Sequence, residues 1–280
     1  FCIIVGFNRG DVYRTKTLYV HDTPDSEARV THPKNINAYL SDAPDVFVWK
    51  RTKPLCKVPE VGIGNKPIDG GNYLFTDEEK DDFLRKEAGA ERFFHPWIGS
   101  KEFLHGYTRW CLWLGDASWQ DLKDLPLCRE RIEAVKEFRL ASKSAGTKKI
   151  ADRPTRFHVE NMPKGNSILI PKVSSERRRY VPLGFIGPET LCSDLVFLAP
   201  NATLYHFGIL HSQLHNAWMR TVAGRLESRY RYSAGVVYNN FVWPEIGEAD
   251  KGKIAELAQG VLDARKLYDG ATLAALYDPN

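Results

Sequence analysis

The chain has 280 residues, of which 43% are hydrophobic and 12% aromatic, so it contains enough apolar material for a sizeable buried core. These fractions exclude a disordered, collagen-like or coiled-coil chain, and no apolar run approaches the roughly 20 residues that a membrane-spanning helix needs. The 39 Lys and Arg against 35 Asp and Glu give a net charge of +4, which is too small to identify a partner.

The cysteines are spread along the chain, with no pair at the spacing of a metal site or a disulfide framework: Cys2, Cys56, Cys111, Cys128 and Cys192. This spacing predicts neither a structural zinc site nor a set of disulfides. It favours a reducing compartment, and we expect the protein to work in the cytoplasm.

The first residues form two apolar runs on either side of residues 8–11, a pattern typical of a hairpin at a sheet edge. No initiator Met and no basic segment precede the first run. We therefore expect it to be a buried strand of an excised piece of a longer protein rather than a signal peptide. Residues 22–33 are polar, contain two prolines and are expected to be a linker.

Two helices are predicted next. Residues 77–86 have helical character, with Thr76 as the N-cap and Glu79 completing a capping box. Apolar residues at helical spacing predict a second helix over 129–145. Before these helices, Asp69–Asn72 is expected to be a tight turn with positive φ at its two glycines.

The middle of the chain predicts four short strands bounded by turn residues, at 157–160, 167–171, 180–185 and 195–198. We expect residues 205–231 to be mostly helical, 235–237 to return as a strand, and 253–268 to form a last helix. The predicted fold class is therefore α+β: a mixed-sheet domain with packed helices, followed by a short C-terminal helical segment.

Basic residues gather in three places. Residues 129–156 contain nine Lys or Arg against four acidic residues, three arginines are adjacent at 177–179, and four more arginines lie within 220–231. One such cluster is most simply a solvated surface. Three clusters in one chain are also typical of a surface that follows nucleic-acid phosphates, and both interpretations remain open.

The segment from Ser174 to Tyr180 lies between two predicted strands, so we expect it to be a hairpin or an extended loop. In an extended loop, Glu176 and Arg178 would project to one side, where Glu can accept from cytosine N4 and Arg can donate to guanine O6 and N7. Arg177 and Arg179 would project to the other side, free to hold phosphates. Alternatively, Glu176 simply neutralises the arginines beside it.

Other familiar motifs are incomplete. His211 and His215 have a spacing that can bind zinc, but Ser212 stands where a zincin motif has Glu, so we expect hydrogen-bonded interfacial histidines. The glycines at 62–64 lack the rest of a dinucleotide-binding motif, and 64–67 is not a Walker loop.

Seven strings of residues are similar to a known family pattern: 64–71 (GNKPIDGG), 96–100 (PWIGS), 109–114 (RWCLWL), 153–158 (RPTRFH), 173–178 (VSSERR), 228–233 (SRYRYS) and 238–244 (YNNFVWP). Together they resemble the target-recognition region of MmeI-like DNA methyltransferases, which include many single-chain restriction-modification enzymes. The resemblance covers nearly the whole chain.

The resemblance implies a division of the chain into three parts. Residues 1–22 would be the last strands of a truncated methyltransferase domain, 46–244 a domain that recognises a target in double-stranded DNA, and 245–280 the start of a C-terminal helical domain. It further implies that the methyltransferase domain of the same parent chain binds S-adenosylmethionine and methylates adenine at N6. The family's cofactor and catalytic loops match nothing here, so no catalytic residue, cofactor or metal is expected in this chain.

The candidate DNA contacts fall into two sets. The base-reading candidates are Ser175, Glu176 and Arg178. The phosphate-contact candidates are Asn65, Lys66, Lys143, Lys148, Lys149, Arg153, Arg156, Lys172, Arg177 and Arg179.

Two other classes of function remain open. A self-sufficient hydrolase acting on nucleic acid or nucleotides would need an acid–base cluster, for which Asp69, His158 and Glu160 are the candidates. A scaffold would instead use its arginines to bind a protein partner.

Overall fold

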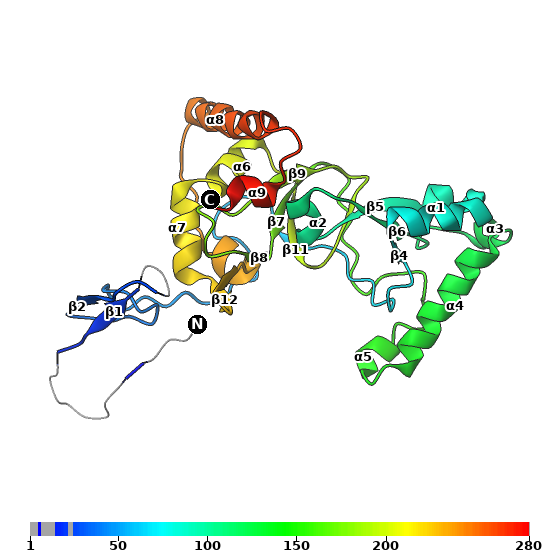
Figure 1. Ribbon diagram of the computed structural model, residues 1–280, viewed down its shortest axis with the longest axis horizontal. Coiled ribbons are helices and arrows are strands. Elements are labelled where there is room, and N and C mark those ends of the chain that lie inside the picture. Colours follow the sequence, from blue (N-terminus) through cyan, green and yellow to red (C-terminus); the bar gives the residue numbers. More distant parts are fainter. Residues whose placement is uncertain (1–4, 7–14, 22–24, 280) are drawn as a thin grey trace.

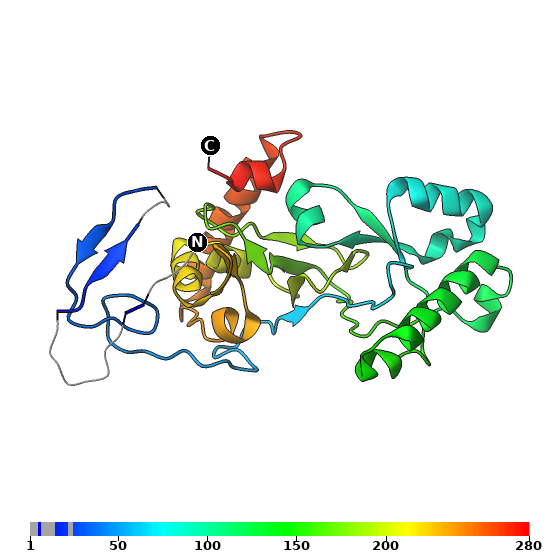
Figure 2. The ribbon, with the colours of Figure 1, turned by 60° about the horizontal axis from the view of Figure 1, so that its bottom comes forward.

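The computed structural model describes residues 5–6, 15–21 and 25–279, so the expected hairpin turn at residues 8–11 lies outside the described residues. Figures 1 and 2 show an elongated molecule. A central body lies between an arm, which contains the helices at residues 77–86, 119–122, 126–141 and 145–148, and a small hairpin near the N-terminus.

Helices occur in the arm, in the body and at the C-terminal end. They are α1 (Asp77–Lys86), α2 (Ser100–His105), α3 (Trp119–Leu122), α4 (Pro126–Ala141), α5 (Ala145–Lys148), α6 (Leu204–Leu210), α7 (Gln213–Val222), α8 (Glu248–Lys266) and α9 (Leu273–Tyr277), with a 3₁₀ turn at Ala88–Phe93 and a π-helical turn at Ala234–Tyr238. None of the helices in the described part of the chain has the length and apolar character needed to span a bilayer.

The strands in the described part of the chain form four small sheets. A hairpin pairs β1 (Leu18–Val20) with β2 (Arg29–Thr31). A second sheet has the strand order β10 (Leu191–Cys192), β5 (Phe94–Ile98), β6 (Arg109–Leu112), β4 (Leu74–Phe75). A third has the order β3 (Gly62–Ile63), β11 (Val196–Pro200), β7 (Ser167–Pro171), β9 (Gly184–Ile186). The fourth has the order β12 (Gly224–Leu226), β13 (Arg229–Arg231), β8 (Val173–Ser174). All pairs are antiparallel except β10 with β5. The predicted α+β class is confirmed.

The sheet of β7 and β11 is buried on both faces. All five residues of β7 are buried, and successive side chains of a strand point to opposite faces. Ile168 and Ile170 join the main core of the body, whereas Leu169 joins a small cluster that faces α2 and β10. The strand predicted at 167–171 is thus confirmed, and its three consecutive apolar residues suit a strand that is buried on both faces.

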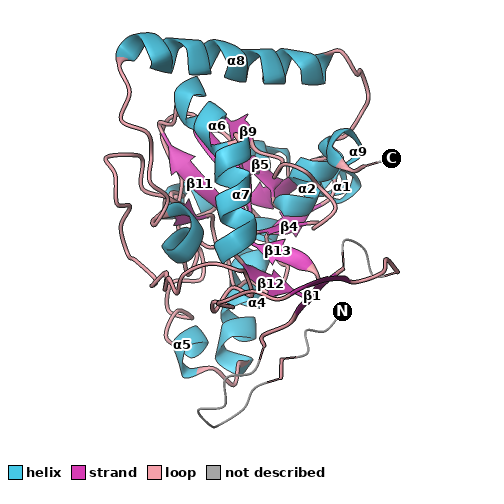
Figure 3. Cartoon of the chain, turned by 90° about the vertical axis from the view of Figure 1, so that its left-hand side faces the viewer, coloured by secondary structure: helices cyan, strands magenta, loops and turns pink. Residues whose placement is uncertain are grey.

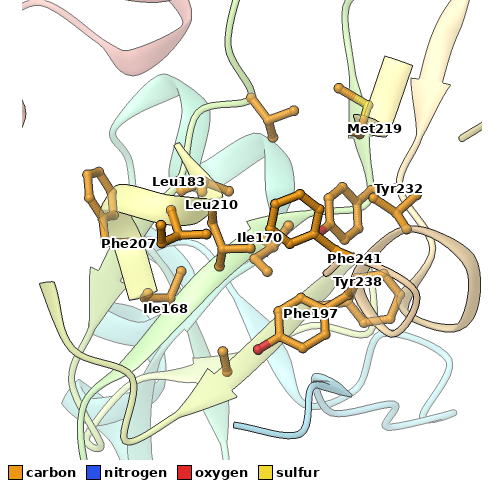
Figure 4. Close-up of a cluster of buried hydrophobic side chains, with 14 of the residues drawn as sticks. Ile168, Ile170, Leu183, Phe197, Phe207, Leu210, Met219, Tyr232, Tyr238 and Phe241 are labelled. Carbon is orange, nitrogen blue, oxygen red and sulfur yellow. The ribbon is translucent and has the colours of Figure 1, made fainter. Parts of the chain in front are cut away.

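The main core packs α6, α7 and the π-helical turn onto this sheet. Figure 4 shows Phe207 and Leu210 from α6 close to Ile168 and Ile170, with Tyr238 and Phe241 beside Phe197. The predicted strand at 235–237 is wrong. The Asn240 side-chain amide donates to the carbonyls of Gly235 and Val236, at 2.9 and 3.2 Å, and so takes acceptors that a sheet ladder would need.

Other predicted boundaries also need correction. The helix predicted over 205–231 is two short helices that end at Val222, because Ser212 caps a new helix and the chain then turns into β12 and β13. The strand predicted over 157–160 is reduced to one bridge between Val159 and Lys66. The linker predicted over 22–33 contains β2, where Val30 and Thr31 favour pairing.

The arm is organised around Arg139 of α4, which has 0% exposure. Its guanidinium donates five hydrogen bonds of 2.8–3.0 Å to main-chain carbonyls: those of Pro67, Ile68, Ile150, Arg153 and Arg156. Burial lowers the pKa of Arg139, and the nearby Tyr73 and Asp69 oppose that shift. One side chain thus holds two connections, before β4 and after α5, against α4.

We expect Arg139→Met to lower the free energy of unfolding by about 4 kcal/mol, because five buried carbonyls lose a charged donor. Denaturant unfolding of the two proteins measures the difference. Arg129→Met makes the same change at an exposed position of α4 and should cost less than about 0.5 kcal/mol. Similar costs at the two positions would show that the buried guanidinium does not hold the arm.

His215 of α7 is buried in the main core. Its Nε2 lies 3.0 Å from the Tyr232 hydroxyl, and its ring meets Phe241 edge-on with centroids 4.6 Å apart. Nδ1 has no hydrogen-bond partner among the described residues, so the expectation of a satisfied histidine holds for one nitrogen only. Burial lowers the pKa of His215 from 6.5 to about 3.

Stability should therefore fall as the pH decreases from about 6.5 toward 3, since the unfolded chain protonates His215 in this range and the folded chain does not. One such group contributes a slope of up to about 1.4 kcal/mol per pH unit. His215→Gln should reduce that slope in denaturant unfolding at pH 7, 6 and 5, while His158→Gln, at an exposed position, should not. Burial also lowers the pKa of His211, to about 4, so some pH dependence of the unfolding free energy remains in both variants. An undiminished slope in His215→Gln would contradict the assignment.

Candidate nucleic-acid interface

Cations gather on the sheet of β12, β13 and β8. Arg229 and Arg231 are exposed on one face of β13, and Tyr230 between them is buried, as the alternation of a strand requires. Arg225 of β12 lies over the Tyr230 ring, 3.7 Å from its centroid. A short twisted sheet therefore presents three arginines to solvent.

Lys172 extends this cationic surface toward the connection between the body and the arm. Its carbonyl accepts from the Tyr232 N–H, and its ammonium lies 5.0 Å from the centroid of the Phe197 ring. Burial lowers the pKa of Lys172; Asp194 opposes the shift, and the charges of Arg231 and Lys66 add to it. Arg231 and Lys66, both exposed, therefore lie within electrostatic reach of Lys172.

Residues 175–180 follow β8 directly. We call them the reading loop, because they include the three base-reading candidates of the sequence analysis. Its first residues form a turn: the Arg178 N–H donates to the Ser175 carbonyl at 3.3 Å, and the Arg177 N–H donates to the Ser175 hydroxyl at 3.2 Å. Of the two expected geometries, the hairpin turn and the extended loop with alternating sides, the structure has a turn, because the Ser175 side chain favours one. Arg177 and Arg179 are exposed, and Glu176 is half-buried.

Contacts from distant parts of the chain fix the reading loop. Arg220 of α7 donates to the carbonyls of Arg178, at 3.4 Å, and of Arg179. The Tyr180 ring stacks on His211, with centroids 5.2 Å apart and ring planes 17° apart. The Arg178 guanidinium pairs with Asp278, Nε to Oδ1, at 2.8 Å. The loop backbone therefore has a defined course.

A second group of cations lies on the arm. Lys143, Lys148, Lys149 and Arg153 are all exposed, on and around α5. The hydroxyl of Ser144 caps α5 by accepting from the Thr147 N–H. Figures 1 and 3 show α5 and β12 on the same lower side of the molecule, with α8 on the opposite side. We use the term basic side for this side of the molecule, which carries the exposed cations around α5 and the exposed arginines of β12 and β13.

Two phosphate-contact candidates have internal partners. Asn65 is fully buried, and its side chain donates to the Cys192 carbonyl at 3.1 Å and accepts from the Asn161 N–H at 2.8 Å. It ties the arm to the body and cannot face a phosphate, which corrects that expectation. Arg156 donates to Asp116, Glu160 and the Gly115 carbonyl, so its guanidinium is already engaged.

The candidates for a hydrolytic site are engaged in structure. Asp69 is buried, and its Oδ2 accepts from the Tyr73 N–H at 2.8 Å. Glu160 accepts from the Phe157 N–H and from Arg156, whereas His158 is exposed. Across residues 5–6, 15–21 and 25–279, no group of three or more His, Cys, Asp or Glu side chains could hold a metal ion.

Comparisons with known proteins agree with this arrangement. The family model of the MmeI target recognition domain matches residues 42–245. The chain belongs to this family. As a member of the MmeI target recognition domain family, it combines an exposed basic surface with a loop fixed from several directions.

Two relatives illustrate the match. DNA methyltransferase A of Bacillus subtilis (strain 168) is 40% identical over 278 residues, which are 99% of this chain and 31% of that protein. The structure of the type IIL restriction-modification enzyme MmeI in complex with DNA has a TM-score of 0.92 and 42% identity, and covers 97% of this chain and 36% of that one. The chain thus spans about a third of the length of each relative.

Two side chains that fix the reading loop were not among the candidates. Arg220 was noted only as a member of a basic cluster, and Asp278 was not singled out. Their contacts join residues 41 and 100 positions apart, so no local pattern predicts them. In this member of the MmeI target recognition domain family, the position of the loop thus depends on residues outside the loop itself.

Arg220→Ala should loosen the reading loop, because two carbonyls lose a charged donor. Amide hydrogen exchange at residues 176–180 should become about tenfold faster, since the local opening free energy falls by roughly 1.5 kcal/mol. Gln213→Ala, at an exposed position of the same helix, is the matched control and should leave exchange unchanged. Equal protection in the two variants would mean that Arg220 does not restrain the loop.

Proposed function

We propose that this chain reads a specific sequence in double-stranded DNA, as the target-recognition domain of a longer adenine-N6 DNA methyltransferase of the restriction-modification type. The observation that carries the proposal is the reading loop, which lies beside an exposed basic sheet in a fold that matches MmeI in complex with DNA. Duplex DNA presents a regular array of phosphates, and exposed cations on one side of a protein suit it.

Base reading is assigned to the reading loop. Glu176 can accept from cytosine N4, Arg178 can donate to guanine O6 and N7, and Ser175 can contact either. Phosphate contacts are assigned to cations outside the arm's internal network: Lys66, Lys143, Lys148, Lys149, Arg153, Lys172, Arg177 and Arg179. Phosphate contacts set the register of the protein on the duplex, and base contacts set the sequence.

The division of labour follows the family resemblance. We propose that residues 46–244 recognise DNA, that residues 1–22 belong to a methyltransferase domain of the same parent chain, and that residues 245–280 begin a helical domain. S-adenosylmethionine would supply the methyl group in that other domain. We assign no contact with it, and no catalytic residue, to the chain described here, and we place the protein in the cytoplasm with its DNA.

Neutralising the exposed loop arginines tests the phosphate assignment. The double variant Arg177→Gln, Arg179→Gln should bind all duplexes more weakly, and log Kd should depend less steeply on log salt, by roughly 0.9 per lost phosphate contact. The preferred sequence, selected from randomised duplexes, should stay the same. In contrast, Glu176→Gln should change the preference at a single base pair.

The matched control removes two positive charges from the first turns of α8, on the side opposite the basic side: Lys251→Gln with Lys253→Gln. It should change neither the salt dependence nor the preferred sequence. If the full-length protein bound duplexes without salt dependence or sequence preference, DNA reading would be excluded and a protein-binding scaffold favoured. Divalent-metal-dependent cleavage confined to Asp69, His158 and Glu160 would support the hydrolase instead.

A further inference from the structure

The Arg178–Asp278 pair joins the reading loop to the end of α9. Nε of Arg178 lies 2.8 Å from Oδ1 of Asp278, and Nη2 lies 3.5 Å from Oδ2. The Arg178 side chain is only 10% exposed, whereas that of Asp278 is 48% exposed. The guanidinium therefore has a fixed direction before any ligand is bound.

The guanidinium has two edges that can donate a pair of parallel hydrogen bonds. Asp278 takes the edge formed by Nε and Nη2. Nη1 makes no hydrogen bond to any residue that the structure describes. The terminal edge, formed by Nη1 and Nη2, therefore keeps donors that no described residue occupies, and a pair of such donors matches guanine O6 and N7.

The carboxylate itself is held in place. The Asp278 N–H donates to the Ala274 carbonyl at 3.0 Å, at the end of α9. One residue earlier, the Tyr277 hydroxyl lies 2.7 Å from Nε2 of His211, and Arg265 of α8 also bonds that hydroxyl. His211 in turn stacks on Tyr180, the last residue of the reading loop. The loop and α9 thus share one rigid support.

We propose that Asp278 is a specificity-determining positioning residue, which orients the Arg178 guanidinium so that its terminal edge faces a guanine. The inference rests on the proposed function, because it takes Arg178 as a base reader. Fixing a long side chain before binding removes part of the ordering cost that each new hydrogen bond must offset. A carboxylate on one edge also increases the selectivity of the other, since a rotated guanidinium could accommodate other bases.

The test measures Kd of the full-length protein for its preferred duplex and for duplexes changed at one base pair at a time. Arg178→Ala identifies the base pair that Arg178 reads, as the pair at which discrimination is lost. Asp278→Asn should reduce discrimination at that pair by about tenfold and leave the other pairs and the salt dependence unchanged. Asp278→Glu should restore part of it. In the Arg178→Ala background, Asp278→Asn should have no further effect.

Asp250→Asn is the matched control, since Asp250 forms an exposed ion pair with Lys253 in the first turns of α8, at the end of the helix far from Arg265. It should preserve discrimination at every pair. The inference is overturned if Asp278→Asn keeps full discrimination, if it tightens binding without losing discrimination, or if it weakens all base pairs equally, which would indicate a purely structural role. Failure of the wild-type protein to discriminate at all would instead remove the proposed function, and the inference with it.

Discussion

A buried positive charge holds the arm of this molecule together. No carboxylate of the described residues bonds Arg139 directly, and its guanidinium is surrounded by five carbonyl oxygens from two separate connections. Burying a charge is costly unless it is well hydrogen-bonded, so these carbonyls must keep their positions for the helix to stay packed. The exposed cations around α5 then project from a scaffold with a defined shape. The buried Arg139 thus determines where the exposed cations of the arm lie.

The same device recurs on a smaller scale at the reading loop. Arg220 binds loop carbonyls, as Arg139 does in the arm, although Arg139 is fully buried and Arg220 is only half-buried. The basic residues of the chain thus form two populations with different physical roles. One population shapes the main chain by binding carbonyls, and the other remains in contact with solvent. A count of charges along the sequence cannot separate them.

Local features of the fold were predictable from the sequence. The capping box of Thr76 and Glu79 begins α1 at the expected residue, and Gly70 and Gly71 both have positive φ in the expected turn. The short strands β12 and β13 fall within the segment predicted to be helical. A single buried residue, Tyr230 of β13, is too short a pattern to distinguish a strand from a helix. The three basic clusters are visible in the sequence, and the assignment of their residues to DNA contacts stays a prediction. The burial of Asn65 and Arg139 was not predicted, since it depends on contacts between segments far apart in the sequence.

The anchoring of the reading loop affects how the specificity of such a domain could be exchanged between relatives. The side chains that could touch bases lie within a few consecutive residues, but the groups that hold them come from α7 and from the end of α9. If the short segment alone were transplanted, its candidate base-contacting side chains would lose the contacts that fix their position. A successful chimera would have to inherit α7 and α9 together with the loop.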